Sequence, residues 1–327
     1  MVTVYDVARM AGVSSATVSR AVNNPDAVSP DTLARITRTI ATLGYTPNKI
    51  AQSLKARASD TVGVIIPDIT NPFQVKLVKG VEKVLSAAGY TPILCDTEES
   101  PDKEERYLRD LMDRRIDGLI LVPAMDSRQA VAMLKQRGLP TVFVDRPISL
   151  DFDCVKSNSL SGLSLLVGHL VGRGCQDIRM IGGPQATLVG RERNEAFRML
   201  LERYRLPWTP DSLVQGDFTL DDGHRLAEAM RRTRPLPQAL VSANNLMGIG
   251  ALKAIREAGL RLSEDLDLVV FDELGDMAEL LERPLTFVRQ PALEMGAQAA
   301  TMLLERIRGG NAQAPRSMVF EPVLVTH

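Results

Sequence analysis

The sequence is poor in the side chains that build disulfide frameworks, metal sites and most catalytic centres. Its three cysteines, Cys95, Cys154 and Cys175, are odd in number, widely spread and without metal-ligand spacing, so we expect reduced, structural thiols. Its three histidines lie far apart in the chain, and no serine or cysteine nucleophile motif stands beside any of them. We therefore predict no metal or other cofactor and no enzymatic activity.

Long apolar segments are also missing. No apolar run approaches the roughly 18 residues that a membrane span needs, and the N-terminus shows no basic-then-apolar leader. The Gly-rich segment at residues 182–190, GGPQATLVG, lacks the GK[ST] ending of a phosphate-binding loop. We therefore expect a cytoplasmic protein with no membrane segment and no nucleotide-binding P-loop.

A large net charge is absent too, but the charge that exists is unevenly placed. The 327 residues carry a net charge of −1, whereas residues 1–60 hold seven basic and four acidic side chains. A chain of this length divides into two or three domains. A modestly basic N-terminal part on a slightly acidic body is typical of a small DNA-binding module joined to a domain that does not contact phosphate.

The most informative segment is residues 3–23, TVYDVARMAGVSSATVSRAVN, which predicts two short helices joined by a tight turn. Thr3 and Asp6 have the spacing of a capping box at the start of the first helix. Gly12 supplies the backbone freedom of a sharp turn. Ser14 then caps a second helix, in which Val18 and Val22 are expected to face inward.

The outer face of the second predicted helix carries small and hydroxyl side chains. Ser15, Ala16, Ser19 and Arg20 are expected to point outward, which suits a helix that enters a DNA groove. Arg20 could form a forked contact with a guanine, and Ala16 could touch a thymine methyl group. The helical spacing of the apolar residues alone is also compatible with a hairpin of two helices that only packs within the protein and does not bind DNA.

The segment AGVSSATVSRAVN, Ala11 to Asn23, resembles the helix-turn-helix signature AGVSxxTVSRxxN of the LacI/GalR transcriptional repressors. The resemblance implies that this helix reads operator DNA in the major groove, with Ser15, Ala16 and Arg20 at the bases and Thr17 and Ser19 at phosphates. The DNA-contacting set expected in this region is Thr3, Tyr5, Ser14, Ser15, Ala16, Thr17, Ser19, Arg20 and Asn23.

A third helix and a hinge follow this unit. Ser29, Pro30 and Asp31 form a helix start, and the apolar stripe that follows ends at Gly44, so we expect a DNA-binding headpiece at residues 1–46. Residues 47–60 then form a hinge helix and linker. The resemblance continues through PNKIAQSLK and implies DNA contacts from Asn48, Ala51, Leu54 and Lys55, with Leu54 inserted into the minor groove. A plain linker with residual helicity is the alternative.

From Val62 onward apolar strands alternate with amphipathic helices, which predicts parallel α/β sheets. Strands are expected at residues 62–66, 91–95, 119–122, 141–144, 178–181, 239–241, 268–271 and 286–289. This stretch is too long for one sheet, so we predict two Rossmann-like lobes. Residues 61–327 form this domain, with one lobe at about 61–158 and 291–317 and the other at about 159–290 and 318–327.

The predicted strands end in polar side chains at the edge where parallel α/β sheets bind ligands. These segments include NPF at 71–73, DRP at 145–147, RER at 191–193, Asn244 and Asn245, and Asp272. Carboxylates accept hydrogen bonds, arginines donate in a fork and amides do both, which is chemistry for a neutral polyol such as a sugar.

Residues 60–325 resemble the periplasmic-binding-protein-type effector domain of LacI/GalR repressors, with the pattern of ribose-binding proteins and ribose-type repressors. The resemblance implies effector contacts from Asn71, Phe73, Asp145, Arg146, Arg191, Asn244, Asp272 and Gln290. Three positions depart from that pattern. Gln74 replaces a second aromatic residue, Asn245 replaces an aspartate, and Glu273 replaces a glycine or aspartate.

The predicted fold is therefore an all-α helix-turn-helix headpiece followed by two Rossmann-like lobes of periplasmic-binding-protein type. The predicted function is a homodimeric repressor that binds a pseudo-palindromic operator under the control of a sugar-like effector between the lobes. Alternatives are control by a protein co-regulator or by a nucleobase, sugar acid or sugar phosphate. A transport-type sugar receptor would need a leader peptide and no headpiece.

Overall fold

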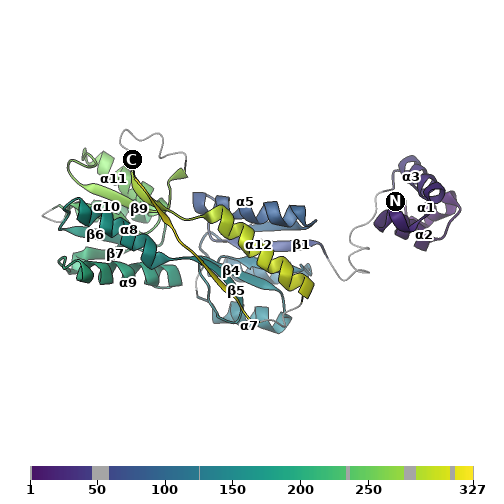
Figure 1. Ribbon diagram of the computed structural model, residues 1–327, viewed down its shortest axis with the longest axis horizontal. Helices are drawn as coiled ribbons and strands as arrows, with labels where there is room; N and C mark the ends of the chain where they lie inside the picture. Colours follow the sequence, from purple (N-terminus) through teal and green to yellow (C-terminus); the bar gives the residue numbers. More distant parts are fainter. Residues whose placement is uncertain are drawn as a thin grey trace. The chain divides into compact units, whose positions relative to one another are not determined.

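The chain divides into two compact units, residues 1–59 and 60–327 (Figure 1). The computed structural model describes residues 2–45, 59–124, 126–232, 236–275, 285–309 and 314–326. The predicted hinge contacts Asn48, Ala51, Leu54 and Lys55 lie outside these ranges. Within them, no helix is both long enough and apolar enough to cross a membrane.

The first unit is a small three-helix domain. Its elements are α1 (Val4–Ala11), α2 (Ser15–Asn23), the short 3-10 helix η1 (Pro25–Ala27) and α3 (Pro30–Leu43). Val7, Val18 and Ile36, one from each α-helix, meet in its core and are almost completely buried. The predicted headpiece helices are confirmed in type and order.

The turn between α1 and α2 forms as the sequence predicts, with one difference in the second helix. Gly12 ends α1 with a left-handed backbone (φ 64°), a conformation that costs most other residues about 1 kcal/mol. In α2 the residue that joins Val18 in the core is Ala21, which is 4% exposed, and Val22 is only partly buried. The predicted Val18–Val22 stripe is thus wrong by one residue, because α2 crosses the other helices on its Val18–Ala21 side.

The second unit contains two parallel sheets. The first has the order β11-β5-β4-β3-β1-β2. Its strands are β1 (Thr61–Ile66), β2 (Thr91–Asp96), β3 (Gly118–Leu121), β4 (Thr141–Val144), β5 (Asp153–Ser157) and β11 (Ser317–Phe320). Its helices are α5 (Pro72–Ala87), α6 (Pro101–Asp113), α7 (Arg128–Arg137) and α12 (Ala292–Gly309).

Strand residues of the first sheet alternate between two apolar layers. Val64 and Ile66 of β1 pack with Leu77 on the side of α5 and α12, whereas Ile65 packs with Leu108 and Leu134 on the side of α6 and α7. Figure 1 shows α5 and α12 side by side along one face of this sheet. Both faces are therefore covered, as the continuous apolar strands require.

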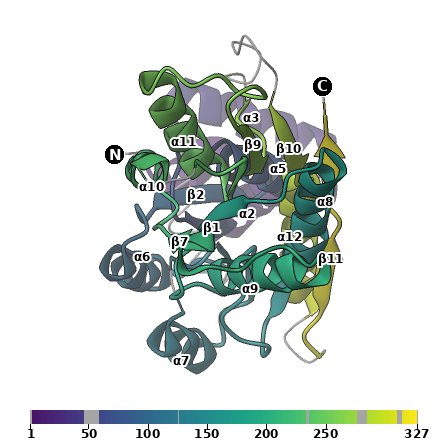
Figure 2. The ribbon, with the colours of Figure 1, turned by 90° about the vertical axis from the view of Figure 1, so that its left-hand side faces the viewer.

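The second sheet has the order β12-β10-β9-β8-β6-β7, in which only β12 is antiparallel to its neighbour. Its strands are β6 (Ile178–Gly182), β7 (Leu213–Gln215), β8 (Ala239–Ser242), β9 (Asp267–Phe271), β10 (Thr286–Arg289) and β12 (Val323–Val325). The helices are α8 (Ser159–Gly172), α9 (Leu188–Arg203), α10 (Leu220–Arg232) and α11 (Asn245–Glu257), and a second 3-10 helix, η2 (Pro210–Ser212), precedes β7. Figure 2 views this lobe end-on.

The chain crosses between the two lobes three times. The crossings are Asn158 between β5 and α8, the segment 290–291 between β10 and α12, and the segment 321–322 between β11 and β12. The last crossing falls a few residues after the expected position at 317. The structure confirms the predicted fold class, a helical headpiece followed by two parallel α/β lobes.

Candidate functional site

The N-terminal end of α2 presents short polar side chains. The hydroxyl of Ser14 accepts a hydrogen bond from the backbone N–H of Thr17 at 3.1 Å, and the two hydroxyl oxygens lie 2.8 Å apart. Ala16 and Arg20 are exposed, while Ser15, Thr17 and Ser19 are partly exposed. The side chains predicted to read bases thus lie on the side of α2 that faces away from the core. The hydroxyl groups of Ser14 and Thr17 are already hydrogen-bonded to each other in the helix cap.

The remaining headpiece positions have different surroundings. Thr3 caps α1 in a reciprocal box with Asp6, whose carboxylate accepts from the Thr3 backbone N–H at 3.0 Å. These hydrogen bonds, together with Arg9, lower the pKa of Asp6. Tyr5 is 72% exposed. Asn23 is the last residue of α2, and its side chain is outside the described part of the structure.

In the second unit, two buried aspartates follow the strands β4 and β9. Asp145 and Asp272 are 7% and 5% exposed, and both have a left-handed backbone, with φ of 61° and 85°. Their backbone N–H groups donate to Val155 and Val288 at 2.8 and 2.9 Å, so each residue is fixed by the neighbouring strand. Such strained positions at strand ends are typical of ligand sites.

Asp272 has an unusual protonation equilibrium. Burial raises its pKa to about 7, although the charge of Arg193 and a hydrogen bond from the Gln290 amide, 2.5 Å from Asp272 Oδ2, oppose the rise. Gln290 is itself 3% exposed, and its Oε1 atom has no partner. The structure therefore places the predicted effector contacts Asp272 and Gln290 next to each other. Gln290 Oε1 remains as an acceptor without a donor.

Arg146 is buried beside Asp145 but is paired to a residue that the sequence did not single out. Its Nη1 and Nη2 atoms donate to the two carboxylate oxygens of Glu99 at 2.7 and 2.8 Å. Its Nε atom lies 3.8 Å from Asp145 Oδ2 and has no hydrogen-bond partner. Although burial works against the charge, the carboxylates of Glu99 and Asp145 raise the pKa of Arg146.

The arginine that the structure brings into this cluster from α9 is Arg193, not the predicted Arg191. Arg193 is 3% exposed and donates through Nη1 to the Ala243 carbonyl at 2.6 Å, while its Nε is buried without a partner. Arg191 is partly exposed, and its Nη2 pairs with Asp126 of the other lobe at 2.6 Å. The two residues point to different sides because they are two positions apart on one helix.

Phe73 is the aromatic side chain that the resemblance predicts as an effector contact. Phe73 packs in the apolar layer under α5 and α12 rather than standing free. Phe271 has the Arg193 guanidinium 3.7 Å from its ring centroid, so that face is covered. Phe218, which the sequence reading missed, is 5% exposed, has a left-handed backbone and lies 5.2 Å from the Arg146 guanidinium.

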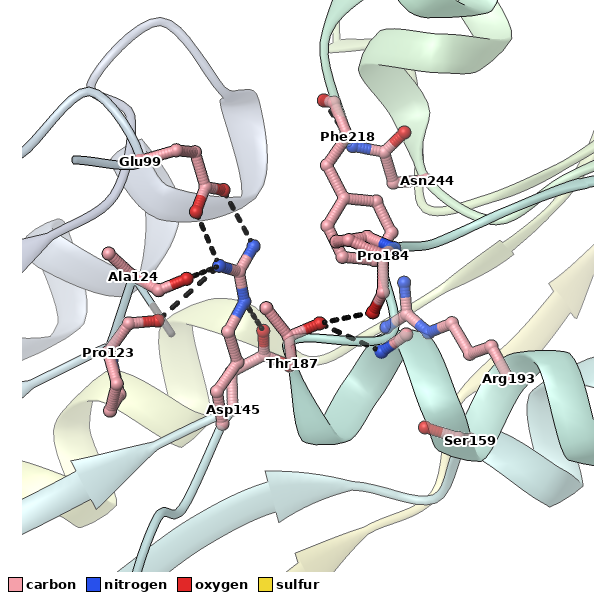
Figure 3. A network of polar contacts seen from close by, with 12 residues as sticks. Glu99, Pro123, Ala124, Asp145, Ser159, Pro184, Thr187, Arg193, Phe218 and Asn244 are labelled. Carbon is pink, nitrogen blue, oxygen red and sulfur yellow. Dashed lines mark hydrogen bonds and ion pairs between the residues drawn. The ribbon is translucent and has the colours of Figure 1, made fainter. Parts of the chain in front are cut away.

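Figure 3 shows how Glu99, Asp145, Arg193, Phe218 and Asn244 lie relative to one another. Glu99 and Asp145 come from the first lobe, and Arg193, Phe218 and Asn244 come from the second. Arg193 carries opposite charge to both Asp145 and Asp272, whose carboxylates partly offset the lowering of its pKa by burial. Charged groups from both lobes therefore interact directly.

The predicted asparagines serve mainly as helix caps and as a bridge between the lobes. Asn244 caps α11 and donates its amide to the Phe218 carbonyl at 2.9 Å. Asn71 caps α5 and also accepts from the side-chain amide of Asn245 at 2.9 Å across the lobes. Lys76 of α5 pairs with Glu273, which completes this second bridge.

Several buried polar atoms in this domain lack partners, which native interiors rarely tolerate without a ligand or water. They are Gln74 Oε1, Arg146 Nε, Ser157 Oγ, Arg193 Nε and Gln290 Oε1. Three of these residues belong to the cluster described above. Across the described residues, no group of three or more histidine, cysteine and acidic side chains could hold a metal ion.

The chain matches two family models. Residues 3–48 match the bacterial regulatory proteins of the lacI family, and residues 59–321 match the periplasmic binding proteins and sugar binding domain of the LacI family. Together they cover the headpiece and both lobes.

Curated relatives cover nearly the whole chain. It is 35% identical to the ribose operon repressor of Escherichia coli K12, over 99% of this chain and 98% of that protein. It is 33% identical to the HTH-type transcriptional repressor PurR of Aliivibrio salmonicida, over 100% of this chain and 98% of the relative.

Solved structures show the same fold. A crystal structure of the Lac repressor dimer bound to operator and the anti-inducer ONPF has a TM-score of 0.88 at 28% identity, covering 99% of this chain and 98% of that chain. A LacI family transcriptional regulator from Enterococcus faecium with bound ribose has a TM-score of 0.72 at 28% identity, covering 81% and 97%. Members of this family are transcriptional regulators, not enzymes. The chain belongs to the LacI family, as a DNA-binding repressor whose two lobes form a periplasmic-binding-protein-like effector domain.

Proposed function

We propose that this repressor responds to a small neutral sugar, of about pentose size, that binds among Asp145, Arg193, Asp272 and Gln290. The observation that carries the proposal is the pair of buried aspartates, fixed in left-handed conformations and facing Arg193. Each sugar hydroxyl both donates and accepts a hydrogen bond. Carboxylates would accept from such hydroxyls, while the unpartnered Arg193 Nε would donate to them.

Phe218 and the remaining predicted residues complete the proposed site. Phe218 offers an aromatic ring that could lie against the apolar face of a sugar ring. Gln290 Oε1 is an unused acceptor. Asn71, Phe73 and Asn244 stay in the proposal as residues that shape the site, since the two amides cap helices and the Phe73 ring is in the core. Arg146 holds Glu99 through its terminal nitrogens, and its unpartnered Nε is a further donor for the ligand. Arg191 is proposed to act at the lobe bridge instead.

The proposed DNA side rests on α2. As a homodimer, the chain would place two copies of α2 in successive major grooves of a pseudo-palindromic operator. Ser15, Ala16 and Arg20 would read bases, while Thr3, Tyr5, Ser14, Thr17, Ser19 and Asn23 would contact the backbone. The hinge contacts Asn48, Ala51, Leu54 and Lys55 belong to the same proposal through the family resemblance.

The effector would act by favouring one arrangement of the lobes. Polar side-chain pairs join the lobes, among them Arg191 with Asp126, Asn71 with Asn245 and Lys156 with Glu192. A ligand that binds one lobe arrangement better than the other therefore shifts the balance between the two arrangements. A nucleobase is the second candidate, because relatives named PurR are among the matches. A flat base stacks best between two aromatic faces, whereas among the described residues only Phe218 offers a ring here, because one face of Phe271 is covered by Arg193 and Phe73 is in the core.

The experiment is a thermal-shift and calorimetric screen of the full chain. The panel contains D-ribose, other pentoses, hexoses, their phosphates, sugar acids, adenine, guanine and hypoxanthine. A neutral sugar that binds wild type, and binds an Asp145→Asn variant at least about tenfold more weakly, supports the proposal. Binding of a nucleobase alone, or of no small molecule while a phosphocarrier-type protein binds, contradicts it.

A further inference from the structure

The loop between β2 and α6 sends one carboxylate across the end of the first sheet. Glu99 lies in this loop, and Arg146 follows β4, which is separated from β2 by β1 and β3 in the sheet order. The carboxylate of Glu99 accepts from both terminal nitrogens of Arg146, at 2.7 and 2.8 Å. The Arg146 side chain is 7% exposed and that of Glu99 is 27% exposed, so the cation of the pair is buried while the carboxylate keeps some contact with solvent. Figure 3 shows Glu99 at this position.

The backbone at this loop is strained to make the contact. Glu98 and Glu99 both have left-handed φ values, 51° and 55°, which cost non-glycine residues about 1 kcal/mol each. Further hydrogen bonds fix the loop. The Glu99 N–H donates to the Pro67 carbonyl at 2.8 Å, and the Ser100 hydroxyl caps α6. The position of the Glu99 carboxylate is therefore built into the fold rather than left to a mobile side chain.

This pairing occupies the edge of Arg146 with which arginine recognises anions. A guanidinium binds a phosphate or carboxylate through two parallel N–H groups. In Arg146 both terminal nitrogens are directed to Glu99, and Nη1 also lies 3.4 Å from the Pro123 carbonyl. Arg193 is partly occupied as well, because Nη1 donates to Ala243 and its flat face lies on Phe271, which leaves its Nε edge for the ligand.

The charge balance of the site leads to the same conclusion. Among the described residues, two buried cations, Arg146 and Arg193, lie near the buried Asp145, Asp272 and Glu104 and the partly exposed Glu99. Without Glu99, Arg146 would have no carboxylate on its two terminal nitrogens, and Asp145 would lie 3.8 Å from its Nε. In a poorly hydrated interior, one uncompensated charge changes the affinity for a charged ligand strongly.

We infer that Glu99 is a specificity-determining residue, which occupies the Arg146 fork with an internal carboxylate and so excludes phosphorylated and acidic sugars from the effector site. This role rests on the proposed neutral-sugar function and deepens it. The Glu99 carboxylate thus takes the place of an anionic ligand that the arginines of the site would otherwise attract.

The test measures the dissociation constants of a neutral sugar and its phosphate, D-ribose and D-ribose 5-phosphate, or D-glucose and D-glucose 6-phosphate if only that sugar binds wild type. Glu99→Gln is expected to lower the ratio of the phosphate constant to the sugar constant by about tenfold or more. Glu99→Asp keeps the charge, but its side chain is one methylene shorter and reaches Arg146 less well, so the ratio should fall less, by about threefold. Glu98→Gln is the matched control, since Glu98 has the same backbone conformation but a 70% exposed side chain.

The outcomes separate this inference from the function on which it rests. A wild-type protein that binds no neutral sugar overturns the proposed function, and the role of Glu99 with it. If wild type binds the sugar but the ratio stays unchanged in both Glu99 variants, only the inference is overturned. A Glu99→Gln chain that loses the sugar without gaining the phosphate also overturns it, because Glu99 would then only position Arg146. Should Glu99→Gln not fold, the Glu99→Asp ratio decides.

Discussion

The guanidinium carbon of Arg193 lies 3.7 Å from the centroid of the Phe271 ring. The two residues come from different elements, α9 and the end of β9, and the stack is buried. A cation on an aromatic face in a desolvated site is held more firmly than at the surface. This contact fixes the plane of Arg193 and directs its unpartnered Nε toward the proposed effector.

Replacing Arg193 by lysine should therefore weaken effector binding strongly. Lysine keeps the charge but cannot stack flat on Phe271 or donate to Ala243 while also contacting a ligand. We expect a loss of about 30-fold or more in sugar affinity, measured by calorimetry.

The matched control is Arg191→Lys on the same helix. Arg191 forms a partly exposed ion pair with Asp126, which contributes about 1 kcal/mol or less. The sugar affinity of the Arg191→Lys variant should stay within about threefold of wild type. The reverse ranking of the two variants would mean that Arg191, as first expected from the sequence, is the ligand contact.

Arg20→Ala should reduce specific DNA binding. Arg20 is exposed on α2, and one good arginine–guanine contact accounts for about 1–3 kcal/mol of discrimination. The measurement is the affinity for DNA selected by the protein from a random duplex library, compared with shuffled DNA. Arg9→Ala on α1, where Arg9 pairs with Asp6, is the control and should change specific and non-specific binding alike. Equal losses for both variants would contradict the assignment of Arg20 to base reading.

Glu104 should make the effector domain less stable at high pH. It is 2% exposed and accepts from the Ala124 N–H at 2.7 Å, and burial raises its pKa from 4.5 to about 7. The folded chain therefore keeps a proton that the unfolded chain has lost, so the free energy of unfolding falls as pH rises from about 4.5 to about 7. At pH 8 the penalty is at most about 3 kcal/mol.

Glu104→Gln keeps an acceptor for Ala124 and removes this penalty. Thermal or urea unfolding should show the variant gaining stability over wild type between pH 5 and pH 8. Glu105→Gln, one residue along the same helix, should leave the pH profile of wild type in place. A constant difference between Glu104→Gln and wild type at all pH values would show that Glu104 does not titrate in this way.

Two glycines of α8 should respond oppositely to alanine. A Cβ at Gly162 would lie 2.5 Å from the Phe271 ring, whereas a Cβ at Gly172 would meet nothing within 4 Å. Gly162→Ala should destabilise the chain by about 1–3 kcal/mol and weaken sugar binding by displacing Phe271 from Arg193. Gly172→Ala should be neutral or stabilising by up to about 1 kcal/mol. Unfolding curves and calorimetry on both variants check the pair.

The fold could largely be predicted because its long elements carry clear periodicity. Helices such as α7 (Arg128–Arg137) lie between residues that mark helix ends in the sequence, here the cap Ser127 and Gly138. The strands β5, β7, β11 and β12 were not predicted. β7 and β12 have three residues each, and β11 is largely exposed, so no apolar run distinguishes them from loops. Pairing with β6, β5 and β10 decides the conformation of β7, β11 and β12, respectively.

The site could be predicted only in part. Aspartates directly after apolar strands, Asp145 and Asp272, were found because the strand ends fix their place. The RER segment at 191–193 was identified, but the family resemblance implied Arg191 rather than Arg193 as the contact. The helical spacing of Arg193, Phe197 and Leu200 on the buried face of α9 was the signal that favours Arg193. Phe218 and Glu99 gave no local signal. Both lie in loops, and only the tertiary fold brings them to Arg146.

The most direct test of the account is operator affinity of the full chain measured while a neutral sugar that binds it is titrated. We predict that the sugar changes the dissociation constant for the selected operator by about fivefold or more, and that Arg193→Lys needs at least about 30-fold more sugar for the same change. Unchanged operator affinity at saturating sugar would contradict the claim that this site controls DNA binding.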